Sequence, residues 1–272
     1  GGIEHAILHL LYSRFVFKFL YDIGVLPKKV GSEPYQKRTA QGMILGEGGI
    51  KMSKSKGNVI NPDDYVAKYG ADTVRMYEMF MGPFDQSIAW DDKGVAGVYR
   101  FLNKVWDLQS KLGGKKASID TPNLLHKSIK KVEEDIIAMR FNTAISQLMI
   151  FANHLDKKKE ISQFVFENFV LILAPFAPHI AEELWSQLGH KDGLPNVWPK
   201  YDENLARDIN VTIGIQVNGK VRDEIDLPND TEPNDKIKQQ ILDKDKVKKY
   251  TEDKEIVKFI HVKNRIISIV VK

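Results

Sequence analysis

The spacing of apolar residues changes once along this chain, and the change limits the folds available to it. Before residue 208 the apolar residues mostly recur every three or four positions, which is typical of amphipathic helices. Beyond that point, Val211, Ile213, Ile215 and Val217 alternate with polar residues, which is typical of a half-buried strand. The chain therefore predicts a mainly helical part followed by a separate part that contains a sheet.

The predicted sheet begins with a hairpin. Asn218-Gly219 is the strongest short turn signal, since both residues adopt positive φ readily, and Val221 to Ile225 supplies the return strand. A helix and two strands are predicted after it, over residues 235–249, 256–262 and 266–271. We therefore predict a small α+β domain over residues 208–272.

Long helices are predicted from Asp91 onward. One begins after a predicted cap at Asn142, and another must end at Ala174 because Pro175 follows directly. Together these helices predict an all-α bundle over residues 92–207.

The first 91 residues mix helices with a short strand. A helix from Ile3 to Tyr21 is followed by a strand over residues 39–46, and Asn61-Pro62 begins the next helix. Between the strand and that helix lies Lys51-Met52-Ser53-Lys54-Ser55-Lys56-Gly57-Asn58, here called the lysine loop. The two flanking elements hold the loop at both ends.

The lysine loop has the composition of a phosphate clamp. Compact lysine ammonium groups, interleaved with serine hydroxyls, follow the oxygens of a polyphosphate leaving group better than a rigid guanidinium does. The alternative is a solvated basic loop, the usual fate of a lysine-rich run.

Composition excludes several other roles. A chain of 272 residues with 43% hydrophobic content holds two or three domains, and the lack of cysteine excludes disulfides and thiolate metal sites. The formal net charge of +4 is small, so a polyanion would be met by local patches. We find neither a membrane-spanning run nor a signal peptide and expect a soluble, cytoplasmic protein.

The chain opens with Gly1-Gly2-Ile3-Glu4-His5, where two glycines allow a ligand to approach the backbone and Glu4 can accept hydrogen bonds from ribose hydroxyls. His5 and His9 stand four residues apart, but without a His-Glu-x-x-His order we predict no metal site. Because no methionine precedes Gly1, we expect the chain to be the downstream part of something longer.

Residues Lys51 to Ser55 form the complete lysine signature of the class I aminoacyl-tRNA synthetases. Nearly all of the chain resembles the C-terminal part of a bacterial-type leucyl-tRNA synthetase. The segments that carry the resemblance are 1–6, 10–15, 41–43, 51–58, 79–83, 86–87, 140–144, 174–179 and 216–222. The valyl and isoleucyl enzymes share the signature, whereas the opening Glu4-His5 segment and the hairpin Val217 to Arg222 point to leucine.

The resemblance implies a multidomain fold. Residues 1–91 would be the C-terminal portion of a class I, Rossmann-like α/β catalytic domain, 92–207 an anticodon-binding-type bundle and 208–272 a tRNA-binding α+β domain. The family joins leucine to tRNA through leucyl-adenylate, with ATP as cosubstrate and Mg²⁺ sharing the charge of the leaving group.

The resemblance also implies roles for particular residues. Lys54 would contact ATP, assisted by Lys51 and by the hydroxyls of Ser53 and Ser55. The edge of the adenosine pocket would include Gly2, Glu4 and His5, and the backbone near Met43 and Ile44 would meet the adenine.

The tRNA would be held through its backbone. Arg140 is the candidate in the bundle, and Lys220, Arg222, Lys263 and Arg265 are the candidates in the last domain. Period-2 spacing predicts Lys220 and Arg222 on one face, although such side chains are also ordinary solvated charges on a hairpin.

Part of the family pattern is missing from this chain. The His-Ile-Gly-His type motif, most of the leucine pocket and the editing domain would lie upstream, on the same chain or on a separate subunit, and the absent methionine favours the same chain. The partners implied are tRNA(Leu), ATP, leucine and this upstream portion, with no membrane. The alternatives are a valyl or isoleucyl synthetase half and a stand-alone tRNA-binding module.

Overall fold

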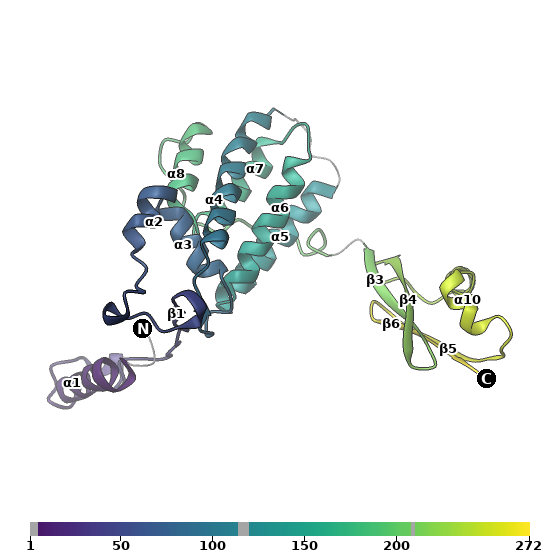
Figure 1. The fold of residues 1–272 in the computed structure, drawn as a ribbon, viewed down its shortest axis with the longest axis horizontal. Helices are drawn as coiled ribbons and strands as arrows, with labels where there is room; N and C mark the ends of the chain where they lie inside the picture. Colours follow the sequence, from purple (N-terminus) through teal and green to yellow (C-terminus); the bar gives the residue numbers. More distant parts are fainter. Residues whose placement is uncertain (1–4, 114–119, 208–209) are drawn as a thin grey trace. The chain divides into compact units, whose positions relative to one another are not determined.

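The computed structural model describes residues 5–113, 120–207 and 210–272. The chain divides into two compact units, Gly1–Tyr201 and Asp202–Lys272 (Figure 1). Helices make up most of the first unit and a four-stranded sheet forms the second, as the change in apolar spacing predicts. The predicted division of the first unit near residue 92 stays a prediction.

The first helical segment begins as a π-helix over Ala6–Leu10 and continues as helix α1, Leu11–Asp22. It ends before Gly24, whose φ of 78° suits a glycine, as predicted. None of the residues of α1 is buried, and Phe15 is 71% exposed. The apolar residues that predicted this helix therefore pack on no core within the described chain.

A short parallel pair of strands follows. It joins β1, Ile44–Leu45, to β2, Ile88–Ala89, in the register Ile44 to Ile88 and Leu45 to Ala89. The strand predicted over residues 39–46 is thus shorter than expected, because β2 offers only two residues to pair with.

Two helices come after the lysine loop. Helix α2, Pro62–Tyr69, begins as predicted: the Asn61 side chain accepts a hydrogen bond from the Asp63 N–H, at 3.3 Å. Helix α3 spans Ala71–Phe80. Short 3₁₀ turns occur at Lys28–Val30, Glu47–Gly49, Lys54–Lys56 and Leu108–Lys111.

The predicted bundle is present. Its helices are α4 (Asp92–Asp107), α5 (Asp120–Ile137), α6 (Phe141–Asp156), α7 (Gln163–Leu173) and α8 (Pro178–Gln187) (Figure 1). Their apolar faces share one core, to which Met76 and Tyr77 of α3 also belong. The Asp72 carboxylate of α3 accepts hydrogen bonds from the N–H groups of His179 and Ile180, so it satisfies the start of α8 from another helix.

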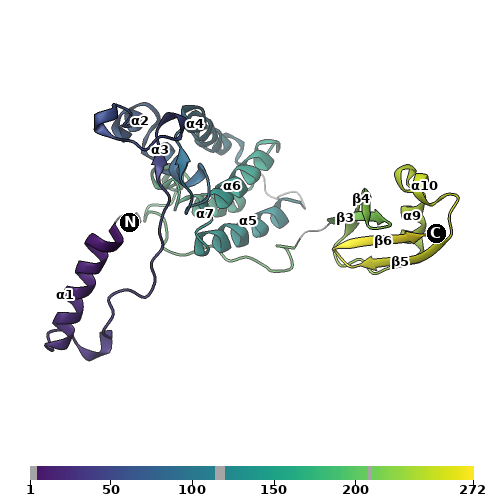
Figure 2. The same cartoon turned by 60° about the horizontal axis from the view of Figure 1, so that its bottom comes forward.

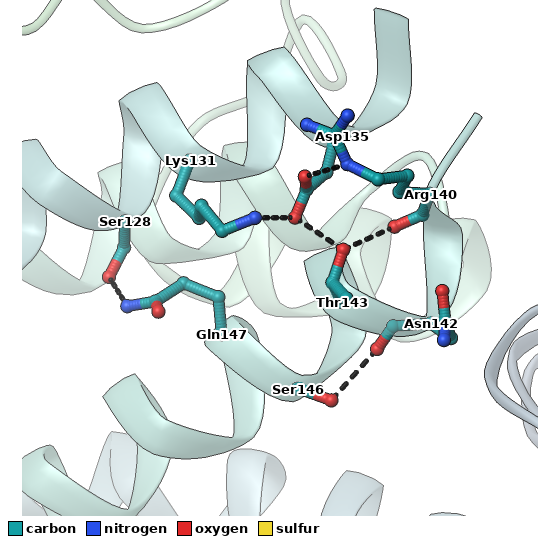
Figure 3. A network of polar contacts seen from close by, with 8 residues as sticks. All are labelled: Ser128, Lys131, Asp135, Arg140, Asn142, Thr143, Ser146 and Gln147. Atoms are coloured by element: carbon teal, nitrogen blue, oxygen red, sulfur yellow. Dashed lines mark hydrogen bonds and ion pairs between the residues drawn. The ribbon is translucent and has the colours of Figure 1, made fainter. Parts of the chain in front are cut away.

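The turn between α5 and α6 is built on Asp135, and the predicted cap at Asn142 is wrong. Helix α6 begins at Phe141, two residues earlier than a cap at Asn142 would place it, and no side chain caps it. Instead the buried Asp135 carboxylate accepts hydrogen bonds from Arg140 Nε at 2.9 Å, from Thr143 Oγ1 at 2.7 Å and from Lys131 Nζ (Figure 3). These donors outweigh the effect of burial and lower the pKa of Asp135.

The second unit is a mixed sheet in the order β4-β3-β6-β5, with helices α9 and α10 on one face (Figure 2). Its elements are β3 (Asn210–Val217), β4 (Lys220–Pro228), α9 (Asp235–Leu242), α10 (Asp245–Thr251), β5 (Ile256–Val262) and β6 (Ile266–Val271). The Asn218-Gly219 turn has φ values of 48° and 78°, as the predicted hairpin requires.

Two details of this unit differ from the predictions. The single helix expected over 235–249 is two helices, since Lys244 has an extended backbone that lets both Ile241 and Val247 reach the core. The regular return strand expected over Val221 to Ile225 is interrupted, because Val221 and Asp223 pair with consecutive residues of β3 and leave Arg222 without a partner in the ladder; the common face of Lys220 and Arg222 stays a prediction.

Every helix in the described ranges is too short or too polar to cross a lipid bilayer.

The Asp135 network gives a prediction for stability. Replacement of Asp135 by Asn removes the charge on which three donors converge, and we expect the free energy of unfolding of the first unit to fall by about 1–3 kcal/mol. Denaturation followed by tryptophan fluorescence measures this unit alone, because Trp90, Trp106, Trp185 and Trp198 all lie in it.

The control is Asp107→Asn, at an exposed aspartate of the same bundle, which should change the stability by less than about 0.5 kcal/mol. Since folding lowers the pKa of Asp135, its contribution is present above the ordinary value of 3.8 and is lost as the pH falls through the lowered value. A difference between wild type and Asp135→Asn that grows in acid would contradict this account.

Candidate active site

A cavity of about 620 Å³ lies beside the β1–β2 pair. It brings together four of the residues predicted to bind ATP: His5, Met43, Ile44 and Lys51. Its other lining residues are Gln41, Gly42, Met52, Glu78, Met79, Met81, Gly82, Pro83, Phe84, Gln86 and Ile88. Side chains from the start of the chain, the first strand and the lysine loop therefore meet in one place.

Two glycines allow the segments around the cavity to approach each other. A Cβ atom on Gly42 would lie 1.8 Å from the backbone oxygen of Gln86, and one on Gly82 would lie 1.8 Å from Cδ1 of Ile88. Either contact is far shorter than atoms tolerate, so any side chain at Gly42 would push the two backbones apart.

Hydrogen bonds join the same segments. The Gly42 N–H donates to the Phe84 carbonyl at 2.8 Å, and the Ile88 N–H donates to the Met43 carbonyl at 3.0 Å. The Met43 N–H donates to Ser87 Oγ at 3.2 Å. Residues 42–45 and 84–90 thus form one connected wall of the cavity.

The lysine loop is closed by Asn58. The Asn58 side chain accepts a hydrogen bond from the Ser53 N–H at 2.9 Å and donates to the Lys51 carbonyl at 3.3 Å. Within the loop, Lys54–Lys56 forms a single 3₁₀ turn, which ends at Gly57 with φ 63°. These bonds and the turn hold the backbone of the loop, while its lysine side chains are exposed.

The three ammonium groups of the loop form no ion pair with any described residue, and all three side chains are exposed. Lys51 lines the cavity, whereas Lys54, Ser53 and Ser55 do not. The hydroxyls of Ser53 and Ser55 lie 2.7 Å apart and bond to each other. The structure therefore places one of the two predicted lysines at the cavity and the other on the adjoining turn.

Sequence reasoning missed Glu78 and the closing role of Asn58. Glu78 lies at the wall of the cavity, where desolvation raises the pKa of its carboxyl group against a smaller opposing effect of Arg75. No motif marks Glu78 in the sequence, because its place at the cavity depends on how α3 packs. Gly2 and Glu4, both predicted to bind ATP, lie outside the described residues.

The residues predicted to hold tRNA differ in whether their side chains already contact another side chain. Arg140 is paired with Asp135, Lys263 with Glu232 at 2.6 Å, and the Arg222 guanidinium lies over the ring of Tyr250, 4.0 Å from its centroid. Lys220 and Arg265 are exposed and form no ion pair with a described residue. The last two are thus the most available for phosphate contacts.

Two family models match the chain. Residues 14–91 match "tRNA synthetases class I (I, L, M and V)", and residues 123–239 match "Anticodon-binding domain of tRNA ligase". The second match ends inside the second compact unit.

The chain is also similar to solved structures. The LeuRS of Agrobacterium radiobacter K84, solved as a LeuRS-tRNA-LeuAMS ternary complex, matches with 33% identity and a TM-score of 0.79, over 100% of this chain and 38% of that chain. A methionyl-tRNA synthetase of Mycobacterium tuberculosis bound by methionyl-adenylate matches at 18% identity and a TM-score of 0.42, over 60% and 43% of the two chains, too weakly to carry an argument.

The chain spans about 38% of the length of the LeuRS it matches, and the whole of it aligns there. Its fold is that of a class I synthetase with a helical anticodon-binding domain and mixed sheets. With the resemblance to LeuRS, these matches show that the chain belongs to the class I aminoacyl-tRNA synthetases.

Proposed function

We propose that this chain is the C-terminal portion of a leucine-tRNA ligase. In that enzyme, leucine and ATP give leucyl-adenylate and pyrophosphate, and the leucyl group then passes to the terminal ribose of tRNA(Leu). The observation that carries the proposal is the cavity in which His5, Met43 and Ile44 meet Lys51 of the lysine loop. The alignment of the whole chain with LeuRS supports leucine as the amino acid.

The lysine loop serves the phosphates of ATP. Unpaired, exposed ammonium groups on an ordered backbone can move toward phosphate oxygens without first breaking an ion pair, which favours stabilisation of charge that grows on the leaving pyrophosphate. Lys51 acts at the cavity itself, and Lys54 acts from the turn beside it, assisted by the hydroxyls of Ser53 and Ser55.

The adenine is held by backbone groups of β1. Both main-chain groups of Met43 are already bonded to the 84–90 segment. In the parallel ladder, the main-chain N–H and C=O of Ile88 bond to Met43 and Leu45, the residues on either side of Ile44. The main-chain N–H and C=O of Ile44 therefore point away from β2. Ile44 is therefore the residue that offers main-chain hydrogen bonds to the adenine, with His5 nearby.

Mg²⁺ enters with ATP. In the described parts of the chain, no three His, Asp or Glu side chains lie close enough together to hold a metal ion. The ion would share the negative charge of the phosphates, while this chain supplies the ammonium groups.

Replacement of Lys54 by Ala should lower the rate of leucine-dependent pyrophosphate exchange by the complete enzyme by roughly 10²-fold or more, the scale of losing one preorganised donor. The matched control is Lys29→Ala, at an exposed lysine outside the cavity, which should leave the rate unchanged. Exchange by Lys54→Ala at the wild-type rate would show that this ammonium group does not act in adenylation.

Residues 1–272 alone should show no amino-acid-dependent exchange, because the chain spans 38% of the LeuRS length and the leucine pocket is expected upstream. Addition of the upstream polypeptide should restore pyrophosphate exchange. The amino acid that supports this exchange, leucine, valine or isoleucine, identifies the enzyme. Exchange by the chain alone would place the active site wholly within it.

Removal of residues 209–272 should weaken tRNA binding and reduce its dependence on salt, since phosphate contacts release counterions, while adenylation stays intact. Replacement of both Lys220 and Arg265 by Ala should reproduce part of the loss without disturbing the fold, because both side chains are exposed. Equal affinity for tRNA with and without the tail at two salt concentrations would show that these side chains are ordinary solvated charges.

A further inference from the structure

A second cavity, of about 430 Å³, shares a wall with the candidate active site. Pro83 and Phe84 line both cavities. The far side of the second cavity is the turn between α5 and α6, through Ala138, Met139, Arg140, Asn142 and Thr143. The loop that bounds the candidate active site therefore faces the helical bundle on its other side.

A chain of aromatic contacts crosses this wall. The ring of Phe84 packs edge-to-face on that of Phe141, with centroids 5.7 Å apart and planes at 86°. Phe141 in turn packs on Phe176, at 6.5 Å and 74°, and Phe176 is only 1% exposed. Phe141 thus links the loop of the active site to the core of the bundle.

The position of Phe141 is set by the residues around it. It directly follows Arg140, whose N–H donates to the Asp135 carbonyl at 2.7 Å and whose Nε donates to the Asp135 carboxylate (Figure 3). Thr143 binds the same carboxylate from within α6. Met139 has a positive φ of 56°, a costly conformation for a residue other than glycine, which surrounding contacts must hold.

On the opposite side, Phe84 is joined to the residues proposed to hold ATP. Its carbonyl accepts the hydrogen bond from Gly42, next to Met43 and Ile44. A shift of the Phe84 ring toward the second cavity would move this carbonyl and strain the wall between residues 42–45 and 84–90.

We propose that Phe141 is a positioning residue for adenylation: held by the Asp135 network, it supports Phe84 and so keeps the Gly42–Ile44 wall in the geometry that binds ATP. The role rests on the proposed function. Phe141 itself touches no substrate, and its effect passes through the Phe84 ring. The bundle therefore contributes to the small-molecule site as well as to the binding of tRNA.

The coupling is tested first without any activity, by hydrogen exchange of the 272-residue chain. Phe141→Leu keeps most of the apolar volume but removes the edge-to-face contact, and it should speed exchange in residues 40–46 and 84–90 by roughly three- to tenfold. The matched control is Phe169→Leu: the pair Phe151–Phe169 has the same geometry, 5.6 Å and 80°, and lines neither cavity.

Phe169→Leu should change exchange within α7 and leave residues 40–46 and 84–90 at wild-type rates. Equal effects of both variants on these two segments would overturn the coupling, because loss of overall stability would then explain them. Phe141→Ala removes more of the ring contact. If this variant does not fold, the comparison of Phe141→Leu with Phe169→Leu still tests the coupling.

The second measurement is pyrophosphate exchange by the complete enzyme. Phe141→Leu should raise the KM for ATP about threefold or more with a smaller change in kcat, whereas Phe169→Leu should lower Tm and leave the KM unchanged. An unchanged KM in Phe141→Leu would overturn the positioning role. If the wild-type enzyme activates no amino acid, the proposed function fails, while hydrogen exchange still decides whether Phe141 supports the wall.

Discussion

The candidate site depends on a close approach of two backbones that only glycine permits. Met43 and Ser87 are 44 residues apart in the sequence, yet they share a hydrogen bond because Gly42 has no side chain to meet Gln86. The backbone hydrogen bonds from Gly42 to Phe84, from Ile88 to Met43 and from Trp90 to Leu45 follow from that approach. Without it, Lys51 and His5 would have no common cavity to line.

Charged groups in the first unit serve two different purposes. Asp135 is buried and held by three donors, so its charge fixes the turn between α5 and α6. The ammonium groups of the lysine loop are exposed and form no ion pair with a described residue, so their charge stays available to a ligand. A paired charge specifies geometry, and an unpaired charge on an ordered loop suits binding and catalysis.

The helical bundle and the candidate site are parts of one packed body. Met76 and Tyr77 of α3 lie in the core of the bundle, while Glu78 and Met79 of the same helix line the cavity. Phe141 extends the same core to the loop that bounds the candidate site. This packing joins the bundle to the wall of the candidate site, and it is the physical basis for the positioning role that we propose for Phe141.

The sequence by itself determined most of the elements and the place of the lysine loop between β1 and α2. The spacing of apolar residues and the positions of glycine and proline located most helices and the Asn218-Gly219 hairpin, because these features depend on neighbours in the chain. Only the tertiary structure decided which residues meet at the cavity, that the Asp135 carboxylate holds the turn before α6, and that Arg222 stacks on Tyr250. The reason is that such contacts join residues that are apart in the sequence, and the local spacing of residues does not predict them.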